Sequence, residues 1–105
     1  MKQEQVIQRI TELGKQILPE GASLWLYGSR ARGDNRPDSD YDLLILLDKD
    51  KITSKDYDSY TYPLFDLGVD MGAVINPQIY VRKDWSLWWR APFYKNVEHD
   101  KIVLK

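Results

Sequence analysis

The most consequential absence in this sequence of 105 residues is cysteine, which does not occur at all. A chain without thiols forms no disulfide, no zinc–thiolate site and no cysteine nucleophile. A basic surplus is also missing, because 15 Lys and Arg residues stand against 16 Asp and Glu residues and the net charge is −1. Proteins that bind duplex nucleic acid gain much of their affinity by neutralising phosphates with basic residues. Tight binding to nucleic acid is therefore not expected.

Long hydrophobic runs are scarce as well. The unbroken run Leu43–Leu47 is far shorter than the ~20 residues of a membrane-spanning helix. The N-terminal stretch MKQEQVIQRITEL is polar and amphipathic, unlike the apolar centre of a signal peptide. No repeat or low-complexity linker divides the chain. These features predict one domain over residues 1–105, in a soluble cytoplasmic protein without a membrane partner.

Apolar periodicity predicts a helix first and then two strands. Apolar residues recur at helical spacing in the N-terminal segment, and a Pro-Glu-Gly stop at residues 19–21 follows them. The recurring residues are Val6, Ile7, Ile10, Leu13, Ile17 and Leu18. Residues 23–27 form an expected strand, which Gly28 ends. Residues 42–47 form a second strand, and its apolar residues on both faces place it centrally in the sheet.

The second half of the chain predicts a further mixture of helices and strands. A helix is expected to begin at Thr53 or Ser54, and Pro63 is expected to disturb its end. The remaining predicted elements are a strand Leu67–Ile75 with a continuation over 78–81, a short helix 85–89 capped by Asp84, a helix from Pro92 to about Glu98 and a strand 102–104. This order predicts an α/β (α+β) fold, a small mixed sheet flanked by helices.

The stretch YGSRARGDNRPDSDYDLLILL, residues 27–47, concentrates the polar chemistry. Asp38, Asp40 and Asp42 alternate directly before the apolar strand. Residues two apart on a strand point to one face with Cα atoms about 6.6 Å apart, so Asp40 and Asp42 are expected to lie together. Two carboxylates at that separation suit a hard cation, and Mg²⁺ favours one or two carboxylates plus substrate phosphates.

The short connection between the two strands predicts how they pair. Only residues 28–39 join them, which is tight for a parallel crossover, so the end of the first strand should lie beside the start of the second. Gly28 would let backbone N–H groups approach a phosphate, Ser29 adds a hydroxyl, and Arg30 or Arg32 adds charge. The stretch therefore predicts a nucleoside triphosphate site.

Other interpretations of the same residues are less specific. The three aspartates could form a solvated acidic turn, and the arginines could be surface charge. A calcium-binding loop also begins with alternating aspartates, but Leu43 stands where that loop needs glycine and Lys49 where it needs glutamate.

The pattern of an apolar residue, Gly28, Ser29, a ten-residue spacer, Asp40, an apolar residue and Asp42 resembles the signature of the DNA polymerase beta nucleotidyltransferase superfamily. It is most similar to the small bacterial minimal nucleotidyltransferases. The resemblance implies a palm-like domain with a mixed sheet, and it matches Tyr27–Ser29 to the phosphate-holding element. It also implies that Asp40 and Asp42 are the first two of three metal-binding carboxylates, and it places Arg32 at the family's arginine.

Members of the family that this chain resembles carry the third carboxylate on a following strand, so one is expected there in this chain as well. The segment FDLGVDMGAVI offers Asp66 and Asp70, which alternation places on one strand face about 13 Å apart, too far to serve one cation. Asp70 is the preferred candidate, because its surroundings are closer to the family's acid-led strand and Gly68 and Gly72 leave room. Asp66 is the alternative.

The resemblance implies a Mg²⁺-dependent transfer of a nucleoside monophosphate, with AMP from ATP as the expected case, to a hydroxyl of a protein or small molecule. Two Mg²⁺ ions are expected. Asp40, Asp42 and Asp70 would be the catalytic, metal-binding residues, and the triphosphate would be bound by Gly28, Ser29, Arg30 and Arg32. Such proteins are often antitoxins paired with a small helical HEPN-type protein. The competing hypothesis is a non-catalytic nucleotide-binding or partner-binding protein on the same fold.

Three tryptophans, Trp85, Trp88 and Trp89, lie close together near the C-terminus. At helical spacing they would share one face, which could cover the sheet, form a partner surface or stack on a nucleotide base. The sequence leaves these alternatives open.

Overall fold

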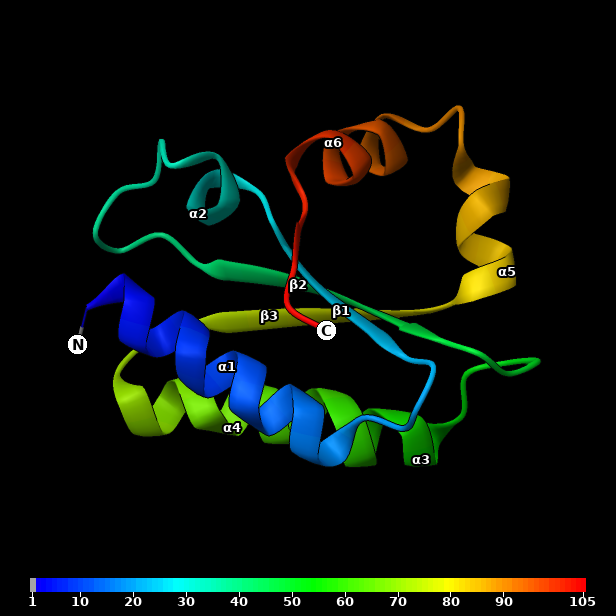
Figure 1. The fold of residues 1–105 in the computed structure, drawn as a ribbon, viewed down its shortest axis with the longest axis horizontal. Helices are drawn as coiled ribbons and strands as arrows, with labels where there is room; N and C mark the ends of the chain where they lie inside the picture. Colours follow the sequence, from blue (N-terminus) through cyan, green and yellow to red (C-terminus); the bar gives the residue numbers. More distant parts are fainter. Residues whose placement is uncertain (1) are drawn as a thin grey trace.

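The computed structural model describes residues 2–105 (Figure 1). Four strands form one mixed sheet in the order β3-β2-β1-β4. Strand β1 (Ser23–Tyr27) is antiparallel to both β2 (Tyr41–Leu47) and β4 (Ile102–Val103), whereas β3 (Ile75–Val81) runs parallel to β2. The predicted mixed sheet with a central second strand is confirmed.

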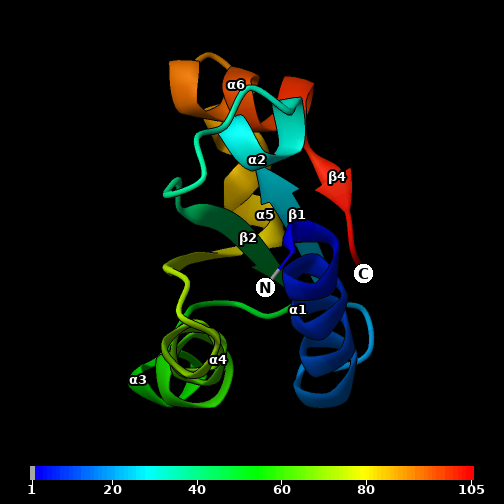
Figure 2. The same ribbon diagram turned by 90° about the vertical axis from the view of Figure 1, so that its left-hand side faces the viewer.

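Helices flank both faces of this sheet. Figure 2 shows α1 and α4 on one side of the sheet and α2 and α6 on the other. The helical elements are α1 (Gln3–Ile17), α2 (Ser29–Arg32), α3 (Ser54–Asp56), the π-helical turn η1 (Tyr57–Thr61), α4 (Tyr62–Met71), α5 (Arg82–Trp85), the 3₁₀ turn η2 (Ser86–Trp88) and α6 (Pro92–Asp100). Within residues 2–105, no helix has both the length and the apolar character needed to cross a membrane.

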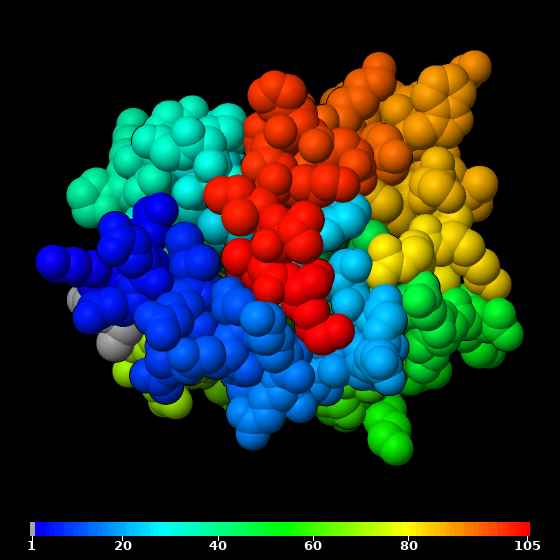
Figure 3. Space-filling view, viewed as in Figure 1, coloured from blue at the N-terminus to red at the C-terminus, as the bar shows by residue number. Residues whose placement is uncertain are grey.

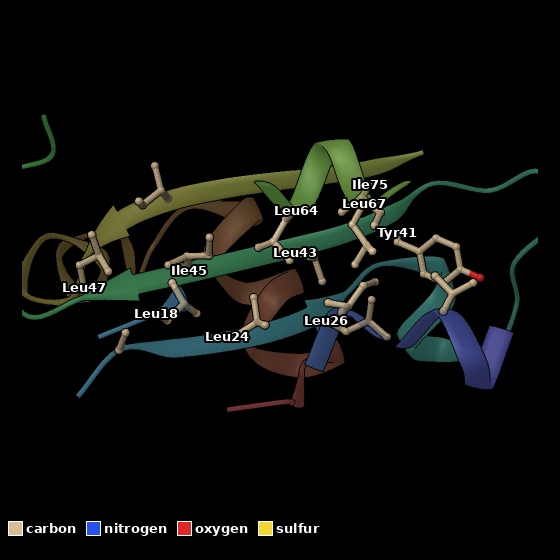
Figure 4. Close-up of a cluster of buried hydrophobic side chains, with 14 residues drawn as sticks. Leu18, Leu24, Leu26, Tyr41, Leu43, Ile45, Leu47, Leu64, Leu67 and Ile75 are labelled. Atoms are coloured by element: carbon tan, nitrogen blue, oxygen red, sulfur yellow. The ribbon is translucent and has the colours of Figure 1, made fainter. Parts of the chain in front are cut away.

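The larger core lies between the sheet and the pair α1 and α4. Side chains of alternate strand residues project into it, as Figure 4 shows for Leu24 and Leu26 of β1 and for Leu43 and Ile45 of β2. Leu64 of α4 packs against them. Because β2 is buried on both sides, its intervening residues enter a second core under α5 and α6, made of Trp25, Leu44, Leu46, Trp85 and Val97.

The predicted strand over Leu67–Ile75 is wrong, because residues 62–71 form helix α4. Leu64 and Leu67 share the side of α4 that is buried against the sheet, which decides in favour of the helix. Gly72 ends the helix in the left-handed conformation, with φ of 71°. Strand β3 begins only at Ile75 and continues to Val81.

Pro63, predicted to disturb the end of the helix that begins at Thr53 or Ser54, lies in the first turn of α4 directly after the π-helical turn η1, and helical structure continues beyond it to Met71. The Thr53 cap is confirmed, since its side chain accepts a hydrogen bond from the Asp56 N–H. Asp84 does not cap the short helix, because α5 begins at Arg82 after Val81 and has no side-chain cap.

The C-terminal elements complete the second layer. Pro92 begins α6 as predicted, and Ile102–Val103 pair with the outer edge of β1. In Figure 3 this last segment, in red, crosses the face of the molecule beside α1. Of the three tryptophans, only Trp85 is buried, whereas Trp88 and Trp89 are exposed.

Candidate functional site

The turn after β1 is built on Gly28. Its φ of 78° and ψ of −158° are accessible to glycine alone among the amino acids without strain. Its carbonyl accepts hydrogen bonds from the N–H groups of Ala31 and Arg32, both at 3.0 Å, which start the single helical turn α2. A Cβ at this position would lie 2.6 Å from Oδ2 of Asp42. The Gly-Ser turn and the carboxylate are therefore in direct proximity.

Asp42 is the second residue of β2 and lies between β1 and β3. It pairs with Tyr27 of β1 in the antiparallel register and with Asn76 of β3 in the parallel register. The predicted antiparallel pairing, with the end of the first strand beside the start of the second, is confirmed. Because Tyr41 and Leu43 enter the core under α1, alternation directs Asp42 to the opposite face of the sheet, the side of α6.

Asn76 lies beside both predicted metal ligands. Its Nδ2 donates a hydrogen bond of 2.8 Å to Oδ2 of Asp40, and on the neighbouring strand it stands in register with Asp42. The amide thus contacts the carboxylate at the end of the loop and neighbours the carboxylate on the strand. Sequence reasoning missed Asn76, because it lies just beyond the segment assigned to the third strand.

The pKa of Asp42 is raised at its partly buried position beside a second carboxylate. Burial raises the pKa of its carboxyl above the usual value, and the charge of Asp40 raises it further. The amide of Asn76 and the positive charge of Arg32 act in the other direction without cancelling the effect. Burial, then Asp42 and Tyr80, raise the pKa of the neighbouring Tyr27 phenol to about 12. A cation at these carboxylates would relieve the repulsion.

Arg30 is committed to the loop that leads into Asp40. Its guanidinium donates to the carbonyl oxygens of Ser39, at 2.8 and 3.1 Å, and of Pro37, at 3.0 Å. It also donates to the side chain of Gln3 and lies 4.3 Å from the centre of the Tyr41 ring. This nearly buried side chain positions the loop, so the structure does not offer Arg30 to a phosphate as the sequence predicted.

Arg32 lies at the rim of the site and remains about half exposed. Its Nη1 donates to Asp100 of α6 at 2.7 Å, and its Nε donates to Asp34 at 3.1 Å. The carboxylate of Asp100 is nearly buried, and hydrogen bonds from His99 and Arg32 lower its pKa below the usual value despite that burial. Arg32 is therefore anchored by α6, a contact between residues 68 positions apart.

Asp66 and Asp70 do not join Asp40 and Asp42. Both lie on the exposed side of α4, which covers the face of the sheet opposite to the one that carries Asp42. Within residues 2–105, no three His, Cys, Asp or Glu side chains are placed to hold one metal ion. The prediction of a third carboxylate depended on a strand that is a helix, and Asn76 takes the strand position beside Asp42.

Comparison with known proteins identifies a family and a shared fold. The sequence model of a family described as "Nucleotidyltransferase domain" matches residues 4–102. A solved structure described as "Crystal structure of the toxin-antitoxin with AMP-PNP" superimposes with a TM-score of 0.65 at 17% identity, covering 94% of this chain and 72% of that chain. At that identity the match shows a shared fold. Among curated proteins, none matches the sequence significantly.

Proposed function

We propose, because this chain belongs to the nucleotidyltransferase domain family, that it transfers a nucleoside monophosphate from a nucleoside triphosphate to a hydroxyl group. The acceptor oxygen would form a bond to the α-phosphorus, the bond from that phosphorus to the bridging oxygen would break, and pyrophosphate would leave. ATP is the proposed donor, and a protein or small molecule the proposed acceptor. The observation that carries the proposal is the convergence of Gly28, Asp40 and Asp42.

The donor set at this convergence fits Mg²⁺. Asp40 and Asp42 lie together beside Asn76, and burial together with the charge of Asp40 raises the pKa of Asp42, an unfavourable effect that a divalent cation offsets. We propose that these two carboxylates would hold the metal that accompanies the triphosphate, where a bound Mg²⁺ supplies charge neutralisation for the phosphates. The resemblance implies two ions, but Asn76 supplies a neutral amide at the place beside Asp42.

The phosphates would contact the Gly-Ser turn. Gly28 allows the backbone to approach closely, and Ser29 offers a hydroxyl and an N–H. Arg32 adds a half-exposed guanidinium that α6 already holds in place, so little side-chain conformational freedom is lost on binding. Arg30 would act indirectly, by fixing the loop that carries Asp40.

A second candidate function is nucleotide or partner binding without transfer. The observation that favours it is Asn76, because an amide at this position cannot accept a proton from an acceptor hydroxyl as a carboxylate can. The similarity in fold to a toxin-antitoxin structure supports an antitoxin role with a protein partner, for which a small helical HEPN-type protein is the proposal. A cytoplasmic location stays a prediction.

The test of transfer uses ATP labelled at the α- or the γ-phosphate, with Mg²⁺ and a cell extract. The α label should move to an acceptor, whereas the γ label should leave in pyrophosphate. The Asp42→Asn variant should transfer neither. If Mg²⁺ and ATP bind but the α label never moves, the protein binds nucleotide without transferring it.

A further inference from the structure

The outward side of α4 and η1 carries exposed apolar side chains that packing within the fold does not explain. Tyr62, Phe65 and Val69 are 56%, 46% and 65% exposed, and Tyr57 on the preceding turn is also exposed. The inward side of α4 already packs on the sheet through Leu64 and Leu67. We call the outward side, with Tyr57, Tyr62, Phe65 and Val69 as its apolar residues, the α4 surface.

A depression runs along this surface. It has a volume of about 600 Å³ and is lined by Tyr57, Thr61, Tyr62, Phe65, Asp66 and Pro77. It therefore extends from the helix to the outer edge strand β3. Figure 2 shows α4 on the β3 side of the molecule, with α1 beside it. Exposed apolar side chains grouped around a depression are typical of interaction sites.

The charge on the α4 surface has one sign. Asp58, Asp66 and Asp70 are exposed on the same helical stretch, and none of them forms an ion pair within residues 2–105. The sequence from residue 56 to 81 contains no Lys, Arg or His, and Lys55 and Arg82 are the first basic residues on either side. Asp66 and Asp70 thus gain an explanation that the nucleotide site does not give them.

The apolar and acidic residues of the α4 surface favour one kind of binding partner over others. Strand addition at β3 is disfavoured, because Pro77 lies within the edge strand and has no N–H to donate. An anionic membrane is disfavoured, because the aspartates would be repelled by acidic headgroups. A helix whose apolar residues enter the depression and whose Lys and Arg residues face the aspartates satisfies both features.

We propose that the α4 surface binds a basic amphipathic helix of a partner protein. The apolar residues of that helix pack on Tyr62, Phe65 and Val69, and its basic residues pair with Asp58, Asp66 and Asp70. The surface lies on the other face of the sheet from Asp42, so this inference does not depend on nucleotide transfer.

The experiment uses two synthetic peptides of about 18 residues, or about five helical turns. Both carry Leu and Phe along one face, one has Lys at the remaining positions, and the other has Glu there. Fluorescence anisotropy with the full chain should show saturable binding of the Lys peptide that weakens with added salt. The Glu peptide should not bind.

Two variants locate the binding. Asp66→Lys combined with Asp70→Lys should weaken binding of the Lys peptide by about tenfold or more and allow the Glu peptide to bind. Phe65→Ser should weaken binding of the Lys peptide as well. Leu87→Ser, on an exposed residue of η2, is the matched control and should change nothing. Unchanged melting temperatures establish that each variant is folded.

The proposal is overturned if neither peptide binds, if both bind equally, or if the charge reversal leaves binding of the Lys peptide unchanged. Sedimentation of the free chain tests whether two copies of it associate through this surface. A concentration-dependent dimer that Phe65→Ser abolishes would mean that a second copy covers this surface, which also overturns the proposed partner.

Discussion

Gly28 and Asp42 touch so closely that the site tolerates no side chain between them. A Cβ at Gly28 would stand 2.6 Å from Asp42 Oδ2, less than any real Cβ contact. In the proposed site, the turn that would bind phosphate and the carboxylate that would bind metal are thus positioned by one close approach between the end of β1 and the start of β2.

The first prediction concerns Gly28→Ala. The variant should lower stability by about 2 kcal/mol or more, because its backbone conformation suits only glycine and its methyl meets Asp42. It should also lose stabilisation by Mg²⁺ with ATP, measured as the shift in melting temperature. Gly33→Ala is the matched control, since Gly33 also has a positive φ, of 87°, but has nothing within 4 Å of its added Cβ. That variant should cost about 1 kcal/mol and keep the ligand-dependent shift; loss of the shift in both variants would argue against the Gly28–Asp42 contact as the cause.

The second prediction concerns Asn76→Asp, which places a third carboxylate beside Asp40 and Asp42. In buffer with a chelator, the repulsion should lower the melting temperature of the variant below that of the wild type. Added Mg²⁺ should raise it by more than it raises the wild type. Gln78→Asp is the control, because Gln78 is exposed two residues further along β3, in register with Leu44. An equal response of both variants to Mg²⁺ would contradict the assignment of Asn76 to the metal site.

The third prediction is a pair of opposite pH dependences. The folded-state pKa of Asp42 is raised above 3.8, so its ionised form lowers stability at pH values above that folded pKa. Asp42→Asn should therefore be more stable than the wild type at neutral pH, and the difference should vanish as the pH falls through the folded pKa.

Asp56 should behave in the opposite way. Burial alone would raise its pKa, but hydrogen bonds from Lys49 and Thr53 outweigh burial and lower it below 3.8. Its contribution to stability is present above 3.8 and is lost as the pH falls through the lower folded value. Asp56→Asn should therefore destabilise at neutral pH and approach the wild type in acid. Chemical denaturation with a chelator across this range measures both, and equal signs for the two variants would contradict the account.

The fourth prediction separates the tryptophans. Trp85 is buried among Trp25, Tyr80, Phe93 and Tyr94, and its Nε1 donates to Glu98 at 2.9 Å. Trp85→Ala should lower the free energy of unfolding by about 3–5 kcal/mol. Trp88→Ala, at an exposed position, should change it by about 0.5 kcal/mol or less. A large loss for Trp88→Ala would show that its indole is buried in solution.

Local patterns predicted the part of the site that depends on short connections. The few residues between β1 and β2 require antiparallel neighbours, which places Asp42 beside Tyr27. The third strand could not be predicted in the same way. Leu67, Val69 and Met71 alternate like a strand, and only the contacts of Leu64 and Leu67 with the sheet decide for a helix. With that register unknown, Asn76 was not identifiable.

Contacts between distant segments were also beyond local patterns. Arg30 and Arg32 are similar in sequence context, yet one is enclosed by the loop over 37–39 and the other is held by Asp100 of α6. The difference arises from how α2 is oriented against the rest of the fold, which no spacing rule specifies. The residues alone offered either arginine to the phosphates, and only the resemblance favoured Arg32.

The central claim is that Asp40 and Asp42, without Asp70, form the metal–triphosphate site, and one melting experiment tests it most directly. A ligand at 100 times its dissociation constant stabilises the folded chain by about 2.7 kcal/mol. With Mg²⁺ and ATP together, the wild type and Asp70→Asn should therefore both show a clear rise in melting temperature, whereas Asp42→Asn should show none. A rise that survives in Asp42→Asn, or that disappears in Asp70→Asn, would contradict the claim.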